Sequence, residues 1–310
     1  MTQLWRIHIR PGGGDPARSY AYCLRKEVIG VGWAIDNDEP LPLERYLELC
    51  GDRYPDGTGN KTVRLLAGMA TGDLAWMRNT QGVYHLCKVR GPWRYEASPE
   101  ARAVDIVNTR HVEIAEVGVE IHVPGKVIAS FIPARTVQRI NGDIALAASI
   151  LIWNKLTDDH LPVALPTSDI FALISPKDCE DLISVYLQTQ GWIVYPARRR
   201  SDTLAYEFVL RHRSDFREAV VQVKTGHSVV DLGAVPSSVD VAFAFQPNEQ
   251  YVGKNPKAVL IKRDDVIDFI STNPRLVPDA VSGWTTLIGS RANFRRAVSA
   301  AIAPTPAGRV

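Results

Sequence analysis

The chain has 310 residues, of which 45% are hydrophobic and 23% charged, a balance that excludes a disordered or fibrous protein. Its 36 basic and 34 acidic residues leave a formal charge of +2, so any polyanion would have to be bound through local clusters rather than a broad positive field. The most apolar stretch, residues 144–153, is about half as long as a membrane-spanning helix. Two arginines among the first ten residues argue against a secretion signal, and the four cysteines lack Cys-x-x-Cys spacing. We therefore expect a cytoplasmic protein.

The length is about twice that of a usual single domain, which predicts two domains. A polar, proline-containing stretch at 159–168 reads as a linker between domains at 1–158 and 169–310. Many short strands with a few helices predict a small, barrel-like α+β first domain, with a hairpin turn at 79–82. The expected strands are 4–9, 28–35, 74–78, 83–89, 111–114 and 127–132, and the expected helices are 41–50, 61–69 and 142–156.

The second domain opens with a well-marked helix. Ser175 is its expected cap, Pro176 occupies the first helical position, and Asp178 completes a capping box. Gly191 is expected to end this helix. A helix followed by strands and then mixed elements predicts an α/β or α+β core. The expected strands are 192–195, 204–210, 219–224, 239–245 and 258–261.

Two strand segments of this second domain carry an acid, an amide and an amine. Gln222 and Lys224 are two residues apart, so their side chains project from the same face of a strand. Glu207 lies fifteen residues before Gln222 in another apolar segment, and the polar residues 211–217 between them suit a hairpin turn. Pairing of the two strands would bring Glu207 near Gln222 and Lys224.

Such a group of side chains has a definite chemistry. The Glu207 carboxylate and the Gln222 amide oxygen are hard ligands suited to Mg²⁺, with Mn²⁺ as a substitute. A bound metal ion polarises a phosphate oxygen and activates a water molecule. Lys224 would orient that water and stabilise charge developing on phosphorus, and Glu180 on the capped helix would reach the same cluster directly or through water.

This arrangement resembles the PD-(D/E)xK nuclease superfamily, which includes many restriction endonucleases, over about residues 175–265. The resemblance implies that Glu180 is the helix glutamate, Glu207 the first acid and Gln222-Val223-Lys224 the acid-x-lysine element. Glu207 replaces the commoner aspartate, and Gln222 replaces the second acid, as in the branch resembling methylation-directed restriction nucleases. Asp202 is an alternative first acid, although it lies in a turn-like segment.

Tryptophans in the first domain follow or begin strand-like segments. The pattern Gly30-x-Gly32-Trp33, the Gly72-Asp73 pair before Trp76 and the Trp93 segment are similar to PUA-like domains of the EVE and YTH kind. That resemblance implies a pocket for a flipped or single-stranded modified base, which aromatic faces would stack upon. The pocket candidates are Trp33, Trp76 and Trp93, with Asn79 as a hydrogen-bonding partner; the alternative is that these tryptophans form the core.

Together the two resemblances imply a modification-dependent, Mg²⁺-dependent DNA endonuclease acting on double-stranded DNA, as in defence against phage. Cleavage of both strands requires two active sites, which predicts a homodimer. One rival hypothesis is a non-catalytic reader of modified DNA or RNA, and another is a repair or defence nuclease indifferent to modification. The arginine clusters at 198–200 and at 211, 213 and 217 are either phosphate contacts or solvated turn residues.

Overall fold

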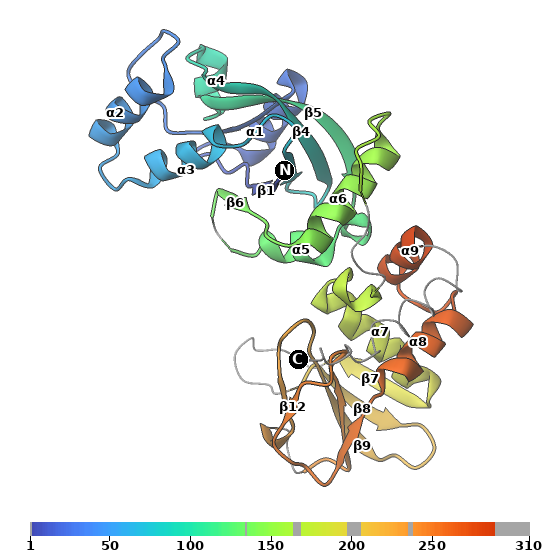
Figure 1. Ribbon diagram of the computed structural model, residues 1–310. Helices are drawn as coiled ribbons and strands as arrows, with labels where there is room; N and C mark the ends of the chain where they lie inside the picture. Colours follow the sequence, from blue (N-terminus) through green and yellow to red (C-terminus); the bar gives the residue numbers. More distant parts are fainter. Residues whose placement is uncertain (1, 134, 164–168, 197–205, 235–237, 289–310) are drawn as a thin grey trace, which may run out of the picture. The chain divides into compact units, whose positions relative to one another are not determined.

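A computed structural model describes residues 2–133, 135–163, 169–196, 206–234 and 238–288 (Figure 1). The chain divides into two compact units, Met1–Pro166 and Thr167–Val310. This division falls inside the stretch expected to be a linker. Among the helices in the described ranges, none has the length and apolar character needed to cross a bilayer. Each unit combines helices with a mixed sheet, so the protein has an α+β character throughout.

The first unit contains a six-stranded sheet in the order β2-β5-β4-β3-β1-β6. Strands β1 and β3 are parallel, and all other neighbours are antiparallel. Within the described residues β2 and β6 are edge strands, so the sheet is open and the expectation of a small barrel is wrong. The strands are β1 (Leu4–Ile7), β2 (Val28–Val31), β3 (Leu74–Arg78), β4 (Tyr84–Tyr95), β5 (Asn108–Gly118) and β6 (Val137–Arg139).

Helices cover both faces of this sheet. Because successive strand residues point to opposite sides, neighbouring residues of β3 pack against different helices. On β3, Ala75 and Met77 join a core that includes Tyr46 and Val63 from the helices before it. On the other face, the Trp76 indole donates to Ser149 Oγ at 3.0 Å. The helices are α1 (Pro16–Lys26), α2 (Leu43–Arg53), α3 (Thr58–Ala67), α4 (Pro99–Ala103), α5 (Gly125–Ser130) and α6 (Asp143–Leu156), with a 3-10 turn at Glu120–His122.

One expected strand is a helix instead. Residues 127–132 read as a strand, but α5 occupies Gly125–Ser130. Val127 and Ser130 are buried at helical spacing, and Pro124 stands at the start of the helix. A short apolar run is compatible with a strand or a helix. Here the burial of Val127 and Ser130 within the unit favours the helix.

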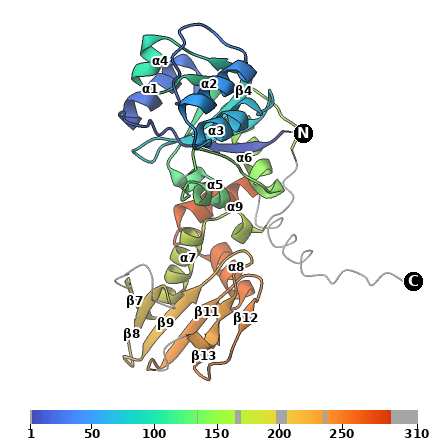
Figure 2. The same cartoon turned by 90° about the vertical axis from the view of Figure 1, so that its left-hand side faces the viewer.

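The second unit is built on a five-stranded sheet in the order β13-β11-β9-β8-β7 (Figure 2). The first three strands along the chain form an antiparallel meander, and β11 and β13 then add parallel to β9. The strands are β7 (Trp192–Pro196), β8 (Phe208–His212), β9 (Glu218–Val223), β11 (Val241–Phe245) and β13 (Ala258–Leu260), and β10 (Val230–Asp231) pairs with β12 (Tyr251–Val252).

The helices of this unit are α7 (Pro176–Thr189), α8 (Arg263–Thr272) and α9 (Asp279–Ile288), with 3-10 turns at Ile170–Ala172 and Leu232–Ala234. The capping box predicted for α7 is confirmed, because Ser175 Oγ accepts from Asp178 N at 3.1 Å and Asp178 accepts from Ser175 N at 2.9 Å. Gly191 follows α7 with a φ of +92°, a conformation that glycine adopts without strain. Aromatic contacts from Phe171 to Phe245 and from Trp192 to Phe243 contribute to the core.

Candidate functional sites

The two strand segments of the second unit bring Glu207 and Lys224 into contact. Strands β8 and β9 pair in antiparallel register with Phe208 opposite Val221, and Glu207 N donates to Val221 O at 2.8 Å. Lys224 Nζ then lies 3.1 Å from Glu207 Oε1. The Glu207 side chain is 13% exposed and that of Lys224 is 37% exposed, so the carboxylate is largely enclosed while the ammonium also reaches solvent.

Gln222, two residues before Lys224, is 7% exposed. Its side-chain oxygen, Oε1, has no hydrogen-bond partner within the described part of the chain. A buried acceptor without a partner costs about 1–3 kcal/mol, which is why such atoms are rare in proteins. The unpaired oxygen therefore indicates either a ligand site or a local loss of stability, two residues before Lys224.

Hydrogen bonds with β11 and with the residue after it hold Lys224 and the chain that follows. Lys224 N donates to Phe245 O at 3.0 Å, which extends the pairing of β9 with β11. Gln246 is 1% exposed, and its Nε2 donates to Gly226 O at 3.0 Å and to Ser228 O at 3.1 Å. This role of Gln246 was not predicted, because a glutamine after an apolar strand has no distinctive spacing. Gln246 thus positions the loop that follows the lysine.

Glu180 lies in the first half of α7, and its side chain is 13% exposed. Lys177, three residues earlier, holds its Nζ 3.7 Å from Glu180 Oε2 and 5.6 Å from the ring centroid of Phe208, the residue after Glu207. The start of α7 therefore lies next to the start of β8. Asp202 and the arginines at 198–200 lie outside the described residues.

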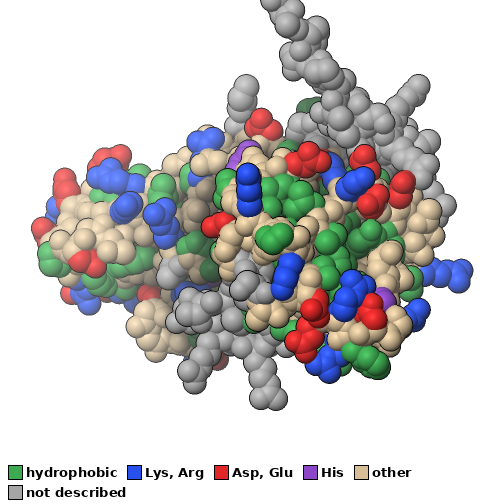
Figure 3. All heavy atoms as spheres, turned by 90° about the horizontal axis from the view of Figure 1, so that it is seen from below, with side chains coloured by type: hydrophobic (Ala, Val, Ile, Leu, Met, Phe, Trp, Pro, Cys, Tyr) green, Lys and Arg blue, Asp and Glu red, His purple; other side chains and the backbone are tan. Residues whose placement is uncertain are grey.

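The second arginine cluster lies at the opposite end of the β8–β9 hairpin from Lys224. Arg211 pairs with Glu218 at 2.6 Å, and Arg217 pairs with Asp215 at 2.8 Å. Two of the three arginines are therefore balanced by neighbouring acids. Figure 3 likewise shows basic and acidic side chains interspersed on the face it presents, as the small net charge leads one to expect.

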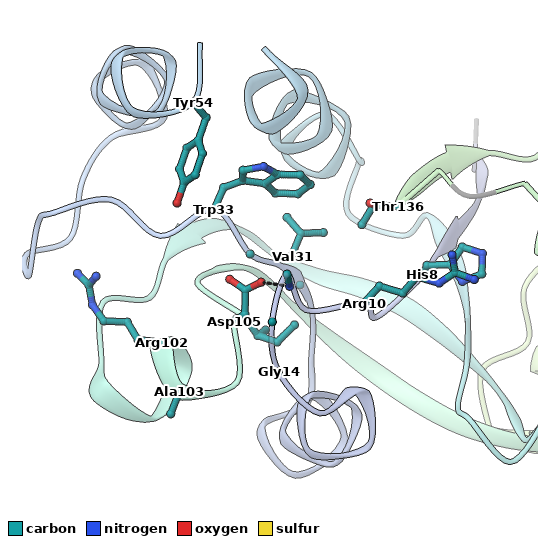
Figure 4. Close-up of a pocket in the computed structure, with 15 residues that line it drawn as sticks. His8, Arg10, Gly14, Val31, Trp33, Tyr54, Arg102, Ala103, Asp105 and Thr136 are labelled. Carbon is teal, nitrogen blue, oxygen red and sulfur yellow. Dashed lines mark hydrogen bonds between the residues drawn. The ribbon is translucent and has the colours of Figure 1, made fainter. Parts of the chain in front are cut away.

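A hollow in the first unit has a volume of about 580 Å³ and borders Trp33 (Figure 4). Its size lies within the range of about 300–1,000 Å³ typical of small-molecule sites. Figure 4 shows the Trp33 indole, the Tyr54 ring and the Asp105 carboxylate around it. The other labelled lining residues are His8, Arg10, Gly14, Val31, Arg102, Ala103 and Thr136.

Glycines make this hollow possible. A Cβ at Gly32 would lie 2.3 Å from Asp105 Oδ1, and a Cβ at Gly59 would lie 2.7 Å from Trp33 Cδ1. Trp33 itself has a φ of +67°, which is uncommon outside glycine, and its carbonyl accepts from Tyr46 OH at 2.7 Å. The Gly30-x-Gly32-Trp33 pattern therefore has a steric basis in the wall of the hollow.

The remaining pocket candidates do not lie around this hollow. Trp76 is fully buried and hydrogen-bonded to Ser149, so it belongs to the core. Trp93 is half-buried and packs against Tyr46 with ring centroids 5.4 Å apart. Asn79 accepts from Gln81 N at 3.0 Å and from Val83 N at 2.8 Å, which closes the predicted hairpin turn. Of the three tryptophans, Trp33 alone lines the hollow.

A smaller hollow of about 150 Å³ shares His8 and Arg10 with the first and borders Arg78 and Asn79. His8 is 6% exposed, and burial together with the charges of Arg6 and Arg10 lowers its pKa from 6.5 to about 4. His8 is therefore neutral at pH 7. The exposed Arg10 forms no ion pair with any described residue, and it contributes positive charge where the two hollows meet.

Among the described residues, no group of three or more His, Cys, Asp and Glu side chains could hold a metal ion. Any metal site around Lys224 would therefore depend on the Gln222 amide as well as on carboxylates. Comparison of the chain with protein-family models, with characterised proteins and with solved structures found no match.

Proposed function

We propose that the protein is a Mg²⁺-dependent endonuclease that hydrolyses phosphodiester bonds in double-stranded DNA. The second unit would cut, and the first unit would recognise a modified base turned out of the duplex. Two copies would act together in the cytoplasm, one on each strand. The order α7, β8, β9 supports this proposal, since it matches the order expected for the glutamate helix, the first acid and the acid-x-lysine strand in the PD-(D/E)xK superfamily.

The observation that carries the proposal is the unpaired Oε1 of Gln222, a buried residue of β9 two positions before Lys224. An amide oxygen without a donor, together with the Glu207 carboxylate, fits a hard cation that prefers oxygen ligands. An ordinary apolar strand would place a hydrophobic side chain at this position, since an unpaired polar group is costly there. Glu207 and Gln222 would hold the metal, with Glu180 contributing from α7.

Once bound, Mg²⁺ would supply Lewis acidity at a phosphate oxygen and lower the pKa of an attacking water. Lys224 is the group that would stabilise the negative charge that accumulates on the phosphate. Its 3.1 Å contact with Glu207 holds the ammonium beside the metal ligands, and its 37% exposure leaves it accessible to a DNA backbone. Gln246 would keep that ammonium in place by fixing the loop after Lys224.

Lys224→Ala tests the assignment. We expect it to lower the rate of plasmid cleavage by at least about 100-fold, which corresponds to about 3 kcal/mol of transition-state stabilisation. Lys254→Ala is the matched control, since Lys254 is an exposed lysine of the same unit and lies outside the cluster. Cleavage by Lys224→Ala at the rate of the control would refute the proposed nuclease.

The hollow beside Trp33 favours a second candidate, a reader that binds modified nucleic acid without cutting it. An aromatic wall with a carboxylate suits a base, whatever the second unit does. Plasmids with unmodified, methylated or hydroxymethylated bases, tested with and without Mg²⁺, separate the candidates. Selective binding without cleavage would favour the reader, and equal cutting of every plasmid would favour a nuclease indifferent to modification.

A further inference from the structure

Asp105 presents a carboxylate to the hollow beside Trp33 (Figure 4). The residue is half-buried and has a φ of +52°, a conformation that aspartate tolerates better than most residues. Its Oδ2 accepts from Gly12 N at 2.7 Å, which holds the carboxylate in one orientation. The absence of a side chain on Gly32 leaves room for it. The Asp105 carboxylate therefore has a fixed position in the wall of the hollow.

No cation of the described residues neutralises this carboxylate. Arg102 also lines the hollow, but its guanidinium donates to the carbonyls of Ile35, Ala97 and Asn37. Its one ion pair is with Asp38, at 3.1 Å. Asp105 therefore keeps an oxygen, Oδ1, that can accept hydrogen bonds from a ligand, because a carboxylate accepts at both oxygens and donates at neither.

The other walls suit a planar ring attached to a phosphate. Trp33 and Tyr54 offer aromatic faces on which a base can stack. Arg10, exposed at the junction with the smaller hollow, offers a positive charge to a phosphate, and His8 beside it adds no charge at pH 7. The Asp105 carboxylate near Trp33 and the Arg10 guanidinium near His8 would together orient a nucleotide with its base toward Asp105.

We propose that this hollow selects a nucleobase that carries an exocyclic amino group, with Asp105 as the residue that recognises it. Adenine, cytosine and guanine present an amino group, whereas thymine and uracil present a single ring N–H between two carbonyl oxygens that a carboxylate repels. Aspartate accepts from the cytosine amino group in other protein–DNA contacts. The inference deepens the proposed function and rests on it for nucleic acid as the ligand.

Binding of short all-thymine single strands to the full chain in EDTA tests this inference by fluorescence anisotropy. The central thymine is kept, or replaced by 5-methylcytosine, adenine or guanine. The first replacement is the sharpest, because thymine and 5-methylcytosine share the methyl group and differ at ring positions 3 and 4. We expect at least one amino-bearing base to bind about tenfold more tightly than thymine, the discrimination typical of one good base contact.

Two variants separate base recognition from general affinity. Asp105→Asn keeps an acceptor for Gly12 N but adds a donor, so it should abolish or reverse the preference. Arg10→Ala should weaken binding of every strand alike, reduce the salt dependence and leave the preference unchanged. The inference fails if no amino-bearing base binds more tightly than thymine, or if Asp105→Asn retains the preference.

Failure of this inference is distinguishable from failure of the proposed nuclease. The binding assay contains no divalent metal and is repeated with Lys224→Ala, which lacks the proposed catalytic lysine. A preference that persists while the wild-type chain cuts no DNA would support base recognition and refute the nuclease. Metal-dependent cutting without any base preference would refute the role of Asp105 and leave the nuclease standing.

Discussion

Replacement of Gly32 by alanine tests the geometry of the hollow most directly. The added Cβ would lie 2.3 Å from Asp105 Oδ1 and 2.5 Å from its Cγ. Ordinary contacts between non-bonded carbons are about 3.5 Å or longer, so the carboxylate has to move by about 1 Å. That shift would break its hydrogen bond from Gly12 N and redirect the acceptor that faces the hollow.

Overpacking of this size costs about 1–3 kcal/mol, which for a unit of this length lowers the melting temperature by roughly 2–12 °C. We expect Gly32→Ala to lose the preference for an amino-bearing base, measured by anisotropy on the same single strands. Gly13→Ala is the matched control, because Gly13 lines the same hollow and nothing lies within 4 Å of its added Cβ. An unchanged preference in Gly32→Ala, or an equal loss in Gly13→Ala, would refute this reasoning.

Three further predictions concern stability and metal binding. The unfolded chain protonates His8 near pH 6.5, but the folded chain does so only near pH 4, so stability should fall by about 3 kcal/mol as the pH drops through this window. In urea unfolding, the free energy of unfolding of His8→Gln should not show this fall. A pH profile unchanged from that of the wild type would contradict the prediction. Trp76→Ala should cost about 3–5 kcal/mol in the same assay, well above the cost of Trp33→Ala, whereas equal costs would place both residues in the core. Gln222→Glu should lower the Mg²⁺ concentration for half-maximal cleavage, and a titration that shows no shift would argue against metal binding at this position.

Features encoded within a few residues were predictable from the sequence. The capping box of α7 needs only Ser175 and Asp178, and the turn at 79–82 is closed by Asn79 itself. The contact between Glu207 and Lys224 was also predictable, because a hairpin joins the two segments. Helix α1 was missed although Asp15 caps it and Pro16 begins it. Its buried side chains follow helical spacing, but they are a serine, a cysteine and two tyrosines, so the sequence shows no strongly apolar face.

The wall of the hollow was not predictable in the same way. Its residues come from segments around positions 8–14, 30–33, 54, 102–106 and 136, which only the completed sheet brings together. Asp105 therefore had no sequence signature. The assignment of Trp76 failed for a related reason: helices cover both faces of β3, so neither face of that strand is open to a ligand. Sequence reasoning identified Trp33 through its glycines but not the acid beside it.

The two proposed sites differ in how far apart their parts lie along the chain. Glu207 and Lys224 are seventeen residues apart and meet as soon as one hairpin forms, whereas the hollow needs contacts that span about two fifths of the chain. Destabilisation of the first unit would therefore abolish base discrimination, while the hairpin that carries Glu207 and Lys224 would stay intact. If both proposals hold, mutations that destabilise the first unit should be more harmful to the host cell than those that inactivate the second. They would leave an active nuclease that no longer recognises the modified base.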